Sequence, residues 1–110
     1  MIVIYGLKTC NSCKKAWRAL GDAGHNISFV DLRANPLAPA FLTALLKEHG
    51  DEVLVNRKST TWRGLDDADR MMPALELLTA HPKLIKRPVV ETSTATYVGW
   101  TASVQAALGV

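Results

Sequence analysis

Cysteine is scarce in this chain of 110 residues, which contains only Cys10 and Cys13. A single C-x-x-C pair leaves no second pair to complete a four-cysteine zinc site. Histidine is equally rare, and the three histidines are scattered over different parts of the sequence, at His25, His49 and His81. We therefore expect no metal centre.

Long apolar runs are also missing. None approaches the ~20 residues that a membrane-spanning helix needs, and the first residues lack the basic-then-apolar layout of a secretion signal. We therefore expect a cytoplasmic protein. Thiols are kept reduced in that compartment, so a close cysteine pair there serves catalysis, sensing or metal binding more often than structure.

The sequence also lacks a polybasic arm. The 13 Lys and Arg residues exceed the 10 Asp and Glu residues by a net charge of +3. This modest excess gives no reason to expect direct nucleic acid binding, and it fits a small anionic ligand better. Apolar residues make up 48% of the chain, which is ordinary for one soluble globular domain.

The order of predicted elements indicates the fold. Apolar, partly β-branched runs at 2–5 and 27–30 predict two strands around a helix from Ser12 to Gly24, which gives a right-handed βαβ unit. Helical patterns follow at 37–49, 66–71 and 73–80, then two strands at 88–91 and 96–98 and a last helix that Thr101 caps. The stretch 56–64 has no clear period, and reads as a functional loop or as the start of a poorly formed helix. We predict an α/β, thioredoxin-like fold (βαβ, helical insertion, ββα) in a single domain, with the insertion at about 37–81.

Cys10 is predicted to lie at the beginning of the first helix. Unpaired N–H groups and the helix dipole favour an anion there, so the position favours a thiolate. Lys14 and Lys15 stand in the first turns, where acidic residues would suit the dipole better, and Lys8 stands just upstream. Lys8 and Lys14 are candidates for lowering the pKa of Cys10, whereas Lys15 reads equally well as a solvated surface charge.

Cys13 falls one turn further, on the apolar face of the same helix with Trp17. Two interpretations stay open for it. It is either the thiol that resolves a mixed disulfide at Cys10, or an inert side chain packed in the core, where cysteine is common.

Three segments carry a resemblance to a known family. The stretches "IVIYGLKTCNSCKKA", "VNRKSTTWRGL" and "HPKLIKRPVVETSTATYVGW" together resemble the arsenate reductase (ArsC)/Spx family, most closely its YffB-like branch of small thioredoxin-fold proteins. The resemblance implies that Cys10 is the nucleophile, that Arg87 precedes a cis-proline at Pro88, and that Arg57 is a second anion-binding arginine.

Two departures from the family pattern bear on the substrate. Arsenate reductases carry a further arginine where this chain has Gly99-Trp100, and an Asn-Pro where it has Lys8-Thr9. These differences speak against arsenate. The second cysteine, Cys13, resembles Spx proteins instead and makes an internal disulfide a real alternative.

The sequence thus supports two hypotheses of different classes. In the first, the protein is a thiol-disulfide oxidoreductase, either a glutathione-dependent thiol reductase or an arsenate-reductase-like enzyme. The residues that act in catalysis are then Cys10, Cys13 and Arg87. The residues that bind the substrate are Arg57, Lys8, Lys14 and Pro88. Its substrate is a small thiol or oxyanion, and no cofactor is bound beyond glutathione as reductant or co-substrate. In the second, a Cys10–Cys13 disulfide is a redox sensor, and the output is contact with RNA polymerase.

Overall fold

The structure, a computed structural model, describes all of residues 1–110. The chain forms two compact units: the first combines residues 1–35 with residues 87–110, and the second consists of residues 36–86. The bounds of the second unit are similar to those of the helical insertion predicted at about 37–81. That the whole chain is one domain stays a prediction. No helix has both the length and the apolar composition needed to cross a membrane.

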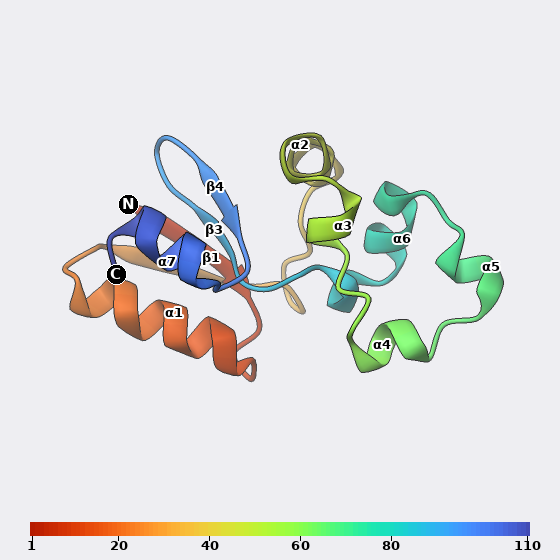
Figure 1. The fold of residues 1–110 in the computed structure, drawn as a ribbon, viewed down its shortest axis with the longest axis horizontal. Coiled ribbons are helices and arrows are strands. Elements are labelled where there is room, and N and C mark those ends of the chain that lie inside the picture. Colours follow the sequence, from red (N-terminus) through yellow and green to blue (C-terminus); the bar gives the residue numbers. More distant parts are fainter. The chain divides into compact units, whose positions relative to one another are not determined.

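A four-stranded sheet forms the centre of the first unit (Figure 1). Strands β1 (Ile2–Gly6) and β2 (Ile27–Asp31) are parallel, and helix α1 (Asn11–Asp22) makes the crossover between them. Strands β3 (Val89–Glu91) and β4 (Thr96–Val98) extend the sheet antiparallel, in the spatial order β2-β1-β3-β4. This arrangement confirms the predicted α/β, thioredoxin-like fold.

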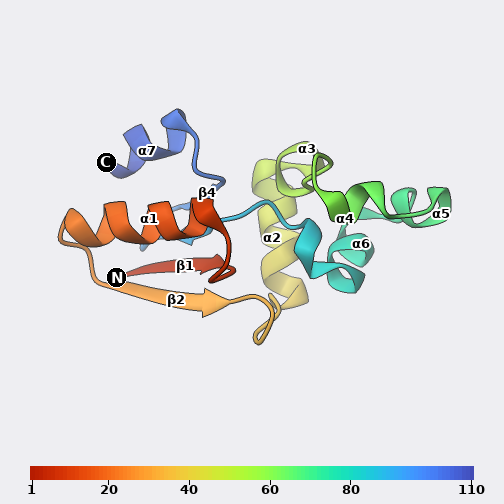
Figure 2. The same cartoon turned by 90° about the horizontal axis from the view of Figure 1, so that it is seen from below.

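The core of the first unit lies on one face of this sheet. Alternate residues of β1 point to this face. Ile2 and Ile4 of β1 pack there against Ala16 and Leu20 of α1. Val90 of β3 completes the cluster. Helix α7 (Ala102–Leu108) adds apolar contacts from the same side, as Figure 2 shows from below. Burial of these side chains fixes α1 on the sheet, and with it the start of the helix where Cys10 stands.

The predicted position of Trp17 was wrong. The helical pattern placed it on the buried face, but its side chain is 43% exposed. The buried stripe of α1 is narrower and runs through Cys13, Ala16 and Leu20. Trp17 lies at the edge of that stripe, and its ring stacks on Phe29 of β2 with the centroids 4.7 Å apart and the planes 12° apart. The indole therefore covers Phe29 and does not pack in the interior beside Cys13.

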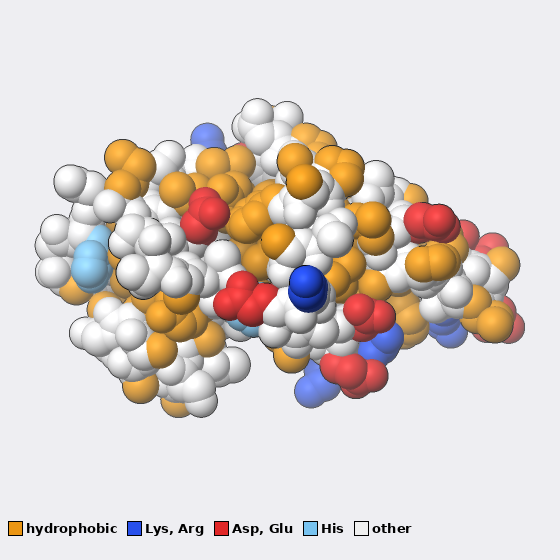
Figure 3. Space-filling view, turned by 90° about the horizontal axis from the view of Figure 1, so that it is seen from above, with side chains coloured by type: hydrophobic (Ala, Val, Ile, Leu, Met, Phe, Trp, Pro, Cys, Tyr) orange, Lys and Arg blue, Asp and Glu red, His pale blue; other side chains and the backbone are white.

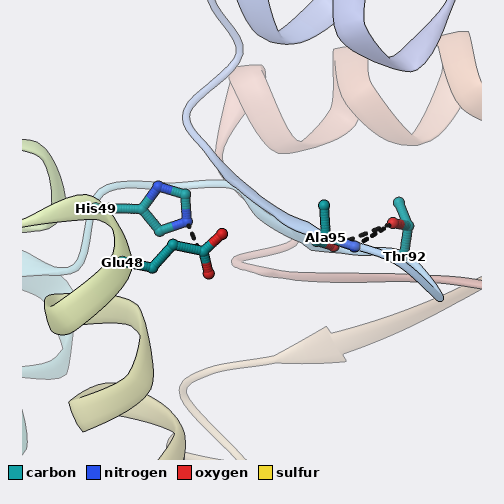
Figure 4. Close-up of polar contacts among 4 residues, drawn as sticks. All are labelled: Glu48, His49, Thr92 and Ala95. Atoms are coloured by element: carbon teal, nitrogen blue, oxygen red, sulfur yellow. Dashed lines mark hydrogen bonds and ion pairs between the residues drawn. The ribbon is translucent and has the colours of Figure 1, made fainter.

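The β3–β4 hairpin closes through its own backbone and one threonine. The Thr92 N–H donates to the Ala95 carbonyl at 2.9 Å, and Thr92 Oγ1 accepts from the Ala95 N–H at 3.0 Å (Figure 4). Thr101 then caps α7 by accepting from the Val104 N–H, and Gly109 ends that helix in the left-handed region at a φ of 76°. The sequence predicted both the hairpin and these two helix ends.

The second unit is helical. Its helices are α2 (Pro39–His49), α3 (Asp51–Leu54), α4 (Thr60–Arg63), α5 (Asp67–Arg70), α6 (Ala74–Ala80) and a 3₁₀ turn, η1 (Pro82–Leu84). Near the end of helix α2, Glu48 Oε2 lies 3.8 Å from His49 Nε2 (Figure 4). The stretch 56–64, left open between loop and helix, contains α4, because Ser59 caps its first turn by accepting from the Trp62 N–H at 3.1 Å.

Candidate active site around Cys10

Cys10 lies at the junction between the β1 loop and α1. Its N–H donates to the Leu7 carbonyl at 3.0 Å, and its own carbonyl accepts from the Lys14 N–H at 3.0 Å, which is the first bond of the helix. The residue is therefore the N-cap, with extended backbone at φ −81° and ψ 122°. Its half-buried side chain makes no full capping hydrogen bond, but it lies within reach of the Cys13 N–H.

Several neighbours stabilise the Cys10 thiolate. Partial burial acts against the charged form and by itself raises the pKa of Cys10, but three donors outweigh it. The thiol of Cys13 donates to the sulfur and the Cys13 backbone N–H lies close to it, and the Arg87 guanidinium adds a hydrogen bond and a positive charge. The net result is a Cys10 pKa below its ordinary value, as an activated nucleophile requires.

Cys13 behaves in the opposite way. Its side chain is 0% exposed, and burial is the largest of the causes that together raise the pKa of Cys13 to about 12. The hydrogen bond to Cys10 and the charge of Cys10 act in the same direction as burial, whereas a backbone hydrogen bond from Leu7 and the charge of Arg87 act against the rise. The pair is therefore polarised at neutral pH, with the proton on Cys13 and the negative charge favoured on Cys10.

Gly6 allows Cys13 to reach this position. A Cβ atom at Gly6 would overlap the Cys13 sulfur, and it would also lie 3.2 Å from Cys13 Cβ. Because glycine has no Cβ, α1 can approach the end of β1 closely enough for the buried thiol to sit beneath Cys10. The apolar run predicted as a strand at 2–5 stops before Gly6, and the sequence pattern did not indicate this packing role.

Arg87 is brought to Cys10 by the register of the sheet. Val89 of β3 pairs with Tyr5 of β1, and Arg87 precedes Val89 by two residues. An antiparallel register therefore carries Arg87 to the point where β1 passes into the Cys10 loop. The Arg87–Pro88 peptide bond is cis, as the family resemblance implied, and the buried Pro88 accepts a hydrogen bond at its carbonyl from the Gly99 N–H at 2.8 Å.

The lysines proposed to influence Cys10 lie on the surface. Lys8 belongs to the turn after β1 and Lys14 to the first turns of α1, and both are exposed. The groups that lower the pKa of Cys10 are Cys13 and Arg87. A part for Lys8 and Lys14 in substrate binding stays a prediction.

Arg57 belongs to the second unit, where it is held by two contacts. Its guanidinium pairs with Glu52 at 3.2 Å and lies over the Trp62 ring, 5.5 Å from the centroid. Arg70 lies against the same ring at 5.7 Å and donates to the carbonyls of Trp62 and Arg63. Trp62 therefore contacts two guanidinium groups. The sequence did not predict the contact with Arg70, because this contact depends on the fold of the second unit.

Arg57 also borders a shallow surface hollow in the second unit. The side chains around it include Lys58 and Lys86, so three cations face one concavity together with Glu52. This arrangement suits a carboxylate or an oxyanion. The action of Arg57 on a substrate at Cys10 stays a prediction.

No group of three or more His, Cys, Asp or Glu side chains is placed to hold a metal ion. The chemistry available at Cys10 is that of a sulfur nucleophile beside a cation and an S–H donor.

The chain belongs to the ArsC family. The ArsC family model matches residues 5–107, which include both cysteines and Arg87. A solved structure of a YFFB protein is similar over 98% of each chain, at 36% identity and a TM-score of 0.90. An arsenate reductase (ArsC) related protein from Brucella melitensis is 34% identical over 99% of this chain and 95% of its own, with a TM-score of 0.74.

A second group of relatives consists of proteins named as global transcriptional regulators, Spx. The global transcriptional regulator Spx 2 of Lactococcus lactis is 29% identical over 107 residues, which cover 91% of this chain and 80% of that protein. The ArsC/Spx family assignment and its YffB-like branch are therefore confirmed.

Proposed function

We propose that the protein is a thiol-disulfide oxidoreductase, and more narrowly a glutathione-dependent thiol reductase with the Cys10 thiolate as nucleophile. Family membership and the similarity to an arsenate reductase related protein support the broader statement. The observation that carries the narrower one is the polarised cysteine pair. Cys10 is placed at the start of a helix, with its pKa lowered by Cys13 and Arg87, while Cys13 retains its proton.

The reaction follows from disulfide exchange. The Cys10 thiolate attacks one sulfur of a substrate disulfide, the sulfur–sulfur bond breaks, and the leaving thiolate takes up a proton. This gives a mixed disulfide between Cys10 and the other half of the substrate. Glutathione thiolates then displace the bound half and regenerate Cys10, so that two glutathione molecules become one glutathione disulfide.

Burial favours glutathione over Cys13 as the group that releases the mixed disulfide. Once Cys10 is in a disulfide, its charge no longer opposes ionisation of Cys13, but the burial that chiefly raises the Cys13 pKa remains. Cys13 is therefore a poor nucleophile at neutral pH. In this proposal it acts first as the S–H donor that holds the charge on Cys10, and its own attack is the slower route.

The remaining residues have roles in binding. Glutathione carries carboxylates, which guanidinium and ammonium groups bind. Arg87 stabilises the reacting sulfur, and Pro88 fixes the backbone beside it. Lys8 and Lys14 are proposed to bind a glutathione carboxylate near the start of α1, and Arg57 to bind an acidic group of the substrate.

The experiment is a glutathione-coupled reduction of 2-hydroxyethyl disulfide. We expect Cys10→Ser to abolish turnover, and Cys13→Ser to retain turnover that rises with glutathione concentration. Arg87→Ala should lower kcat/KM by about tenfold or more, because it removes a charge-assisted hydrogen bond to the nucleophile. Full activity in Cys10→Ser would refute the proposal, and loss of all turnover in Cys13→Ser would assign the release step to Cys13.

A second candidate is a redox-sensing regulator of the Spx kind. The observation in its favour is the hydrogen bond between the Cys10 and Cys13 side chains, together with relatives named as transcriptional regulators. In this case oxidation of the pair would switch contact with RNA polymerase. Pull-down of the polymerase by the oxidised protein only, with no disulfide reductase activity, would favour this function over the enzyme.

A further inference from the structure

The exposed side of α1 carries a row of cations that begins beside Cys10. Lys14, Lys15 and Arg18 are all exposed, and together with Asn11 they line one shallow hollow. Their spacing along the sequence places them on one side of the helix. We call Asn11, Lys14, Lys15 and Arg18 the basic stripe.

Helix stability does not account for this stripe. The first turn of α1 contains no acidic residue, although the dipole favours acidic residues there and disfavours cations by about 0.3–1 kcal/mol each. The Glu52–Arg57 ion pair and the Glu48–His49 contact both lie outside α1. Lys14 stands at the end of this first turn, and Lys15 and Arg18 continue the positive charge along the exposed side of the helix, so an anionic partner that lies along α1 would meet all three cations.

Trp17 adds an apolar element next to the stripe. Its ring is held parallel to Phe29 and still remains 43% exposed. An aromatic ring already fixed on the surface loses little conformational freedom on binding, and tryptophan is common among residues that dominate protein interfaces. The combination of a fixed aromatic side chain and neighbouring cations fits a polypeptide better than it fits a small ion.

We propose that the basic stripe and Trp17 form a docking surface for an acidic protein segment that carries the disulfide to be reduced by Cys10. This inference rests on the proposed function and names its substrate class, an acidic protein disulfide. Docking along α1 would bring the partner's sulfur to Cys10, because Cys10 is the N-cap of the same helix. Cys10 then attacks that sulfur, the partner's other sulfur leaves as a thiol, and glutathione releases the partner as described above.

Charge complementarity selects this partner over nucleic acid. The stripe contains three cations on one short helix, which is fewer than the six to ten phosphate contacts typical of strong DNA binding. Figure 3 shows the face turned away from α1, where both acidic and basic side chains are present. A nucleic acid also contains no sulfur for Cys10 to attack.

The test uses a matched pair of peptide substrates. Each has a single Cys joined by a disulfide to a second copy of the same peptide; Glu residues flank the Cys in one, and Gln residues replace them in the other. The enzyme variants are Lys15→Glu/Arg18→Glu and, as a control with the same change of charge, Arg33→Glu/Lys47→Glu at two exposed positions outside α1. Reduction is followed by coupled glutathione oxidation at low salt and at about 0.15 M salt.

We expect wild type to favour the Glu peptide at low salt, and Lys15→Glu/Arg18→Glu to lower the kcat/KM ratio of the Glu to the Gln peptide by about tenfold or more. The control variant should leave this ratio within about twofold of wild type. Trp17→Ala should weaken reduction of both peptides without changing that of 2-hydroxyethyl disulfide.

Three outcomes overturn the inference while leaving the reductase intact. The first is an unchanged peptide ratio in Lys15→Glu/Arg18→Glu. The second is an equal loss of activity towards 2-hydroxyethyl disulfide, which would assign the stripe to glutathione. The third is competition by a duplex DNA oligonucleotide at lower concentration than an acidic peptide without cysteine. Wild type that reduces none of these disulfides would instead refute the proposed function itself.

Discussion

The side chain of Cys13 occupies the space that a Cβ atom at Gly6 would need. A glycine at the end of β1 and a cysteine one turn into α1 are thus a matched pair. The glycine allows the helix to approach the strand, and the buried thiol can then donate to Cys10 above it. This contact links the packing of the first unit to the state of its nucleophile.

Substitution of Gly6 by alanine should destabilise the protein. The added methyl group must displace the buried Cys13 sulfur, and overpacking of this kind costs about 1–3 kcal/mol. The free energy of unfolding from urea denaturation measures the loss. Gly64→Ala is the matched control, because a Cβ atom there would meet the Thr60 carbonyl oxygen at an ordinary 3.5 Å.

A double variant separates this contact from other effects of alanine at position 6. Cys13→Gly in the Gly6→Ala background removes the overlapping sulfur, so it should cost less stability than Cys13→Gly does in wild type. Strictly additive free energies would show that the two residues do not compete for the same space.

Removal of the Arg87 charge should raise the pKa of the Cys10 thiol. Arg87 lowers it by a hydrogen bond and by its charge, so Arg87→Ala should raise it, and Arg87→Lys should raise it by less. The rate of alkylation by iodoacetamide as a function of pH gives the value. Lys15→Ala is the control, and an equal shift in that variant would mean that general surface charge, not Arg87, sets the pKa.

Stability should fall in mild alkali because of Cys13. Its pKa is raised to about 12 in the folded protein, whereas an unfolded cysteine titrates near 8.5. The folded state therefore keeps a proton that the unfolded state loses, so this contribution to stability is complete below pH ~8.5 and is lost as the pH rises towards about 12. The slope from this group is at most about 1.4 kcal/mol per pH unit.

Urea denaturation between pH ~7 and pH ~10 measures this decline. The slope should be smaller in Cys13→Ser, which has no thiol to ionise. Tyr5 acts in the same direction at higher pH, because burial and its 2.9 Å hydrogen bond to Glu91 raise the pKa of Tyr5 to about 12. A decline that is identical in wild type and Cys13→Ser would contradict the assignment.

Arg70 should contribute more to the stability of the second unit than Arg57 does. Both contact the Trp62 ring, but Arg70 also donates to two backbone carbonyls, whereas Arg57 is 45% exposed in its side chain and pairs with a Glu52 that is 90% exposed. We expect Arg70→Ala to lower the free energy of unfolding by about 1–2 kcal/mol and Arg57→Ala by less than ~1 kcal/mol. Chemical denaturation compares the two, and a larger loss for Arg57→Ala would reverse the ranking.

The order of elements could be predicted from the sequence because their signals are local. Apolar runs mark β1 and β2, Thr101 and Gly109 bound α7, and a helical period marks α1. The same kind of reasoning failed for Trp17. Whether a residue at the edge of an apolar stripe is buried depends on the side chains of the neighbouring strand, and here the Trp17 ring stacks on Phe29 of β2. It left 56–64 undecided, because Ser59 caps a helix too short to show a period.

The sequence by itself determined that a cysteine would stand at the start of a helix after a buried strand, because both features depend on neighbours within a few positions. Only the tertiary structure decided that Cys13 is buried and keeps its proton, the question that the sequence left open. That choice depends on the burial of Cys13 against Gly6 and on the sheet register that brings Arg87, 77 positions further along the chain, to Cys10. A pKa responds to solvent exclusion and to charges nearby in space, and neither can be read from the spacing of two residues in a sequence.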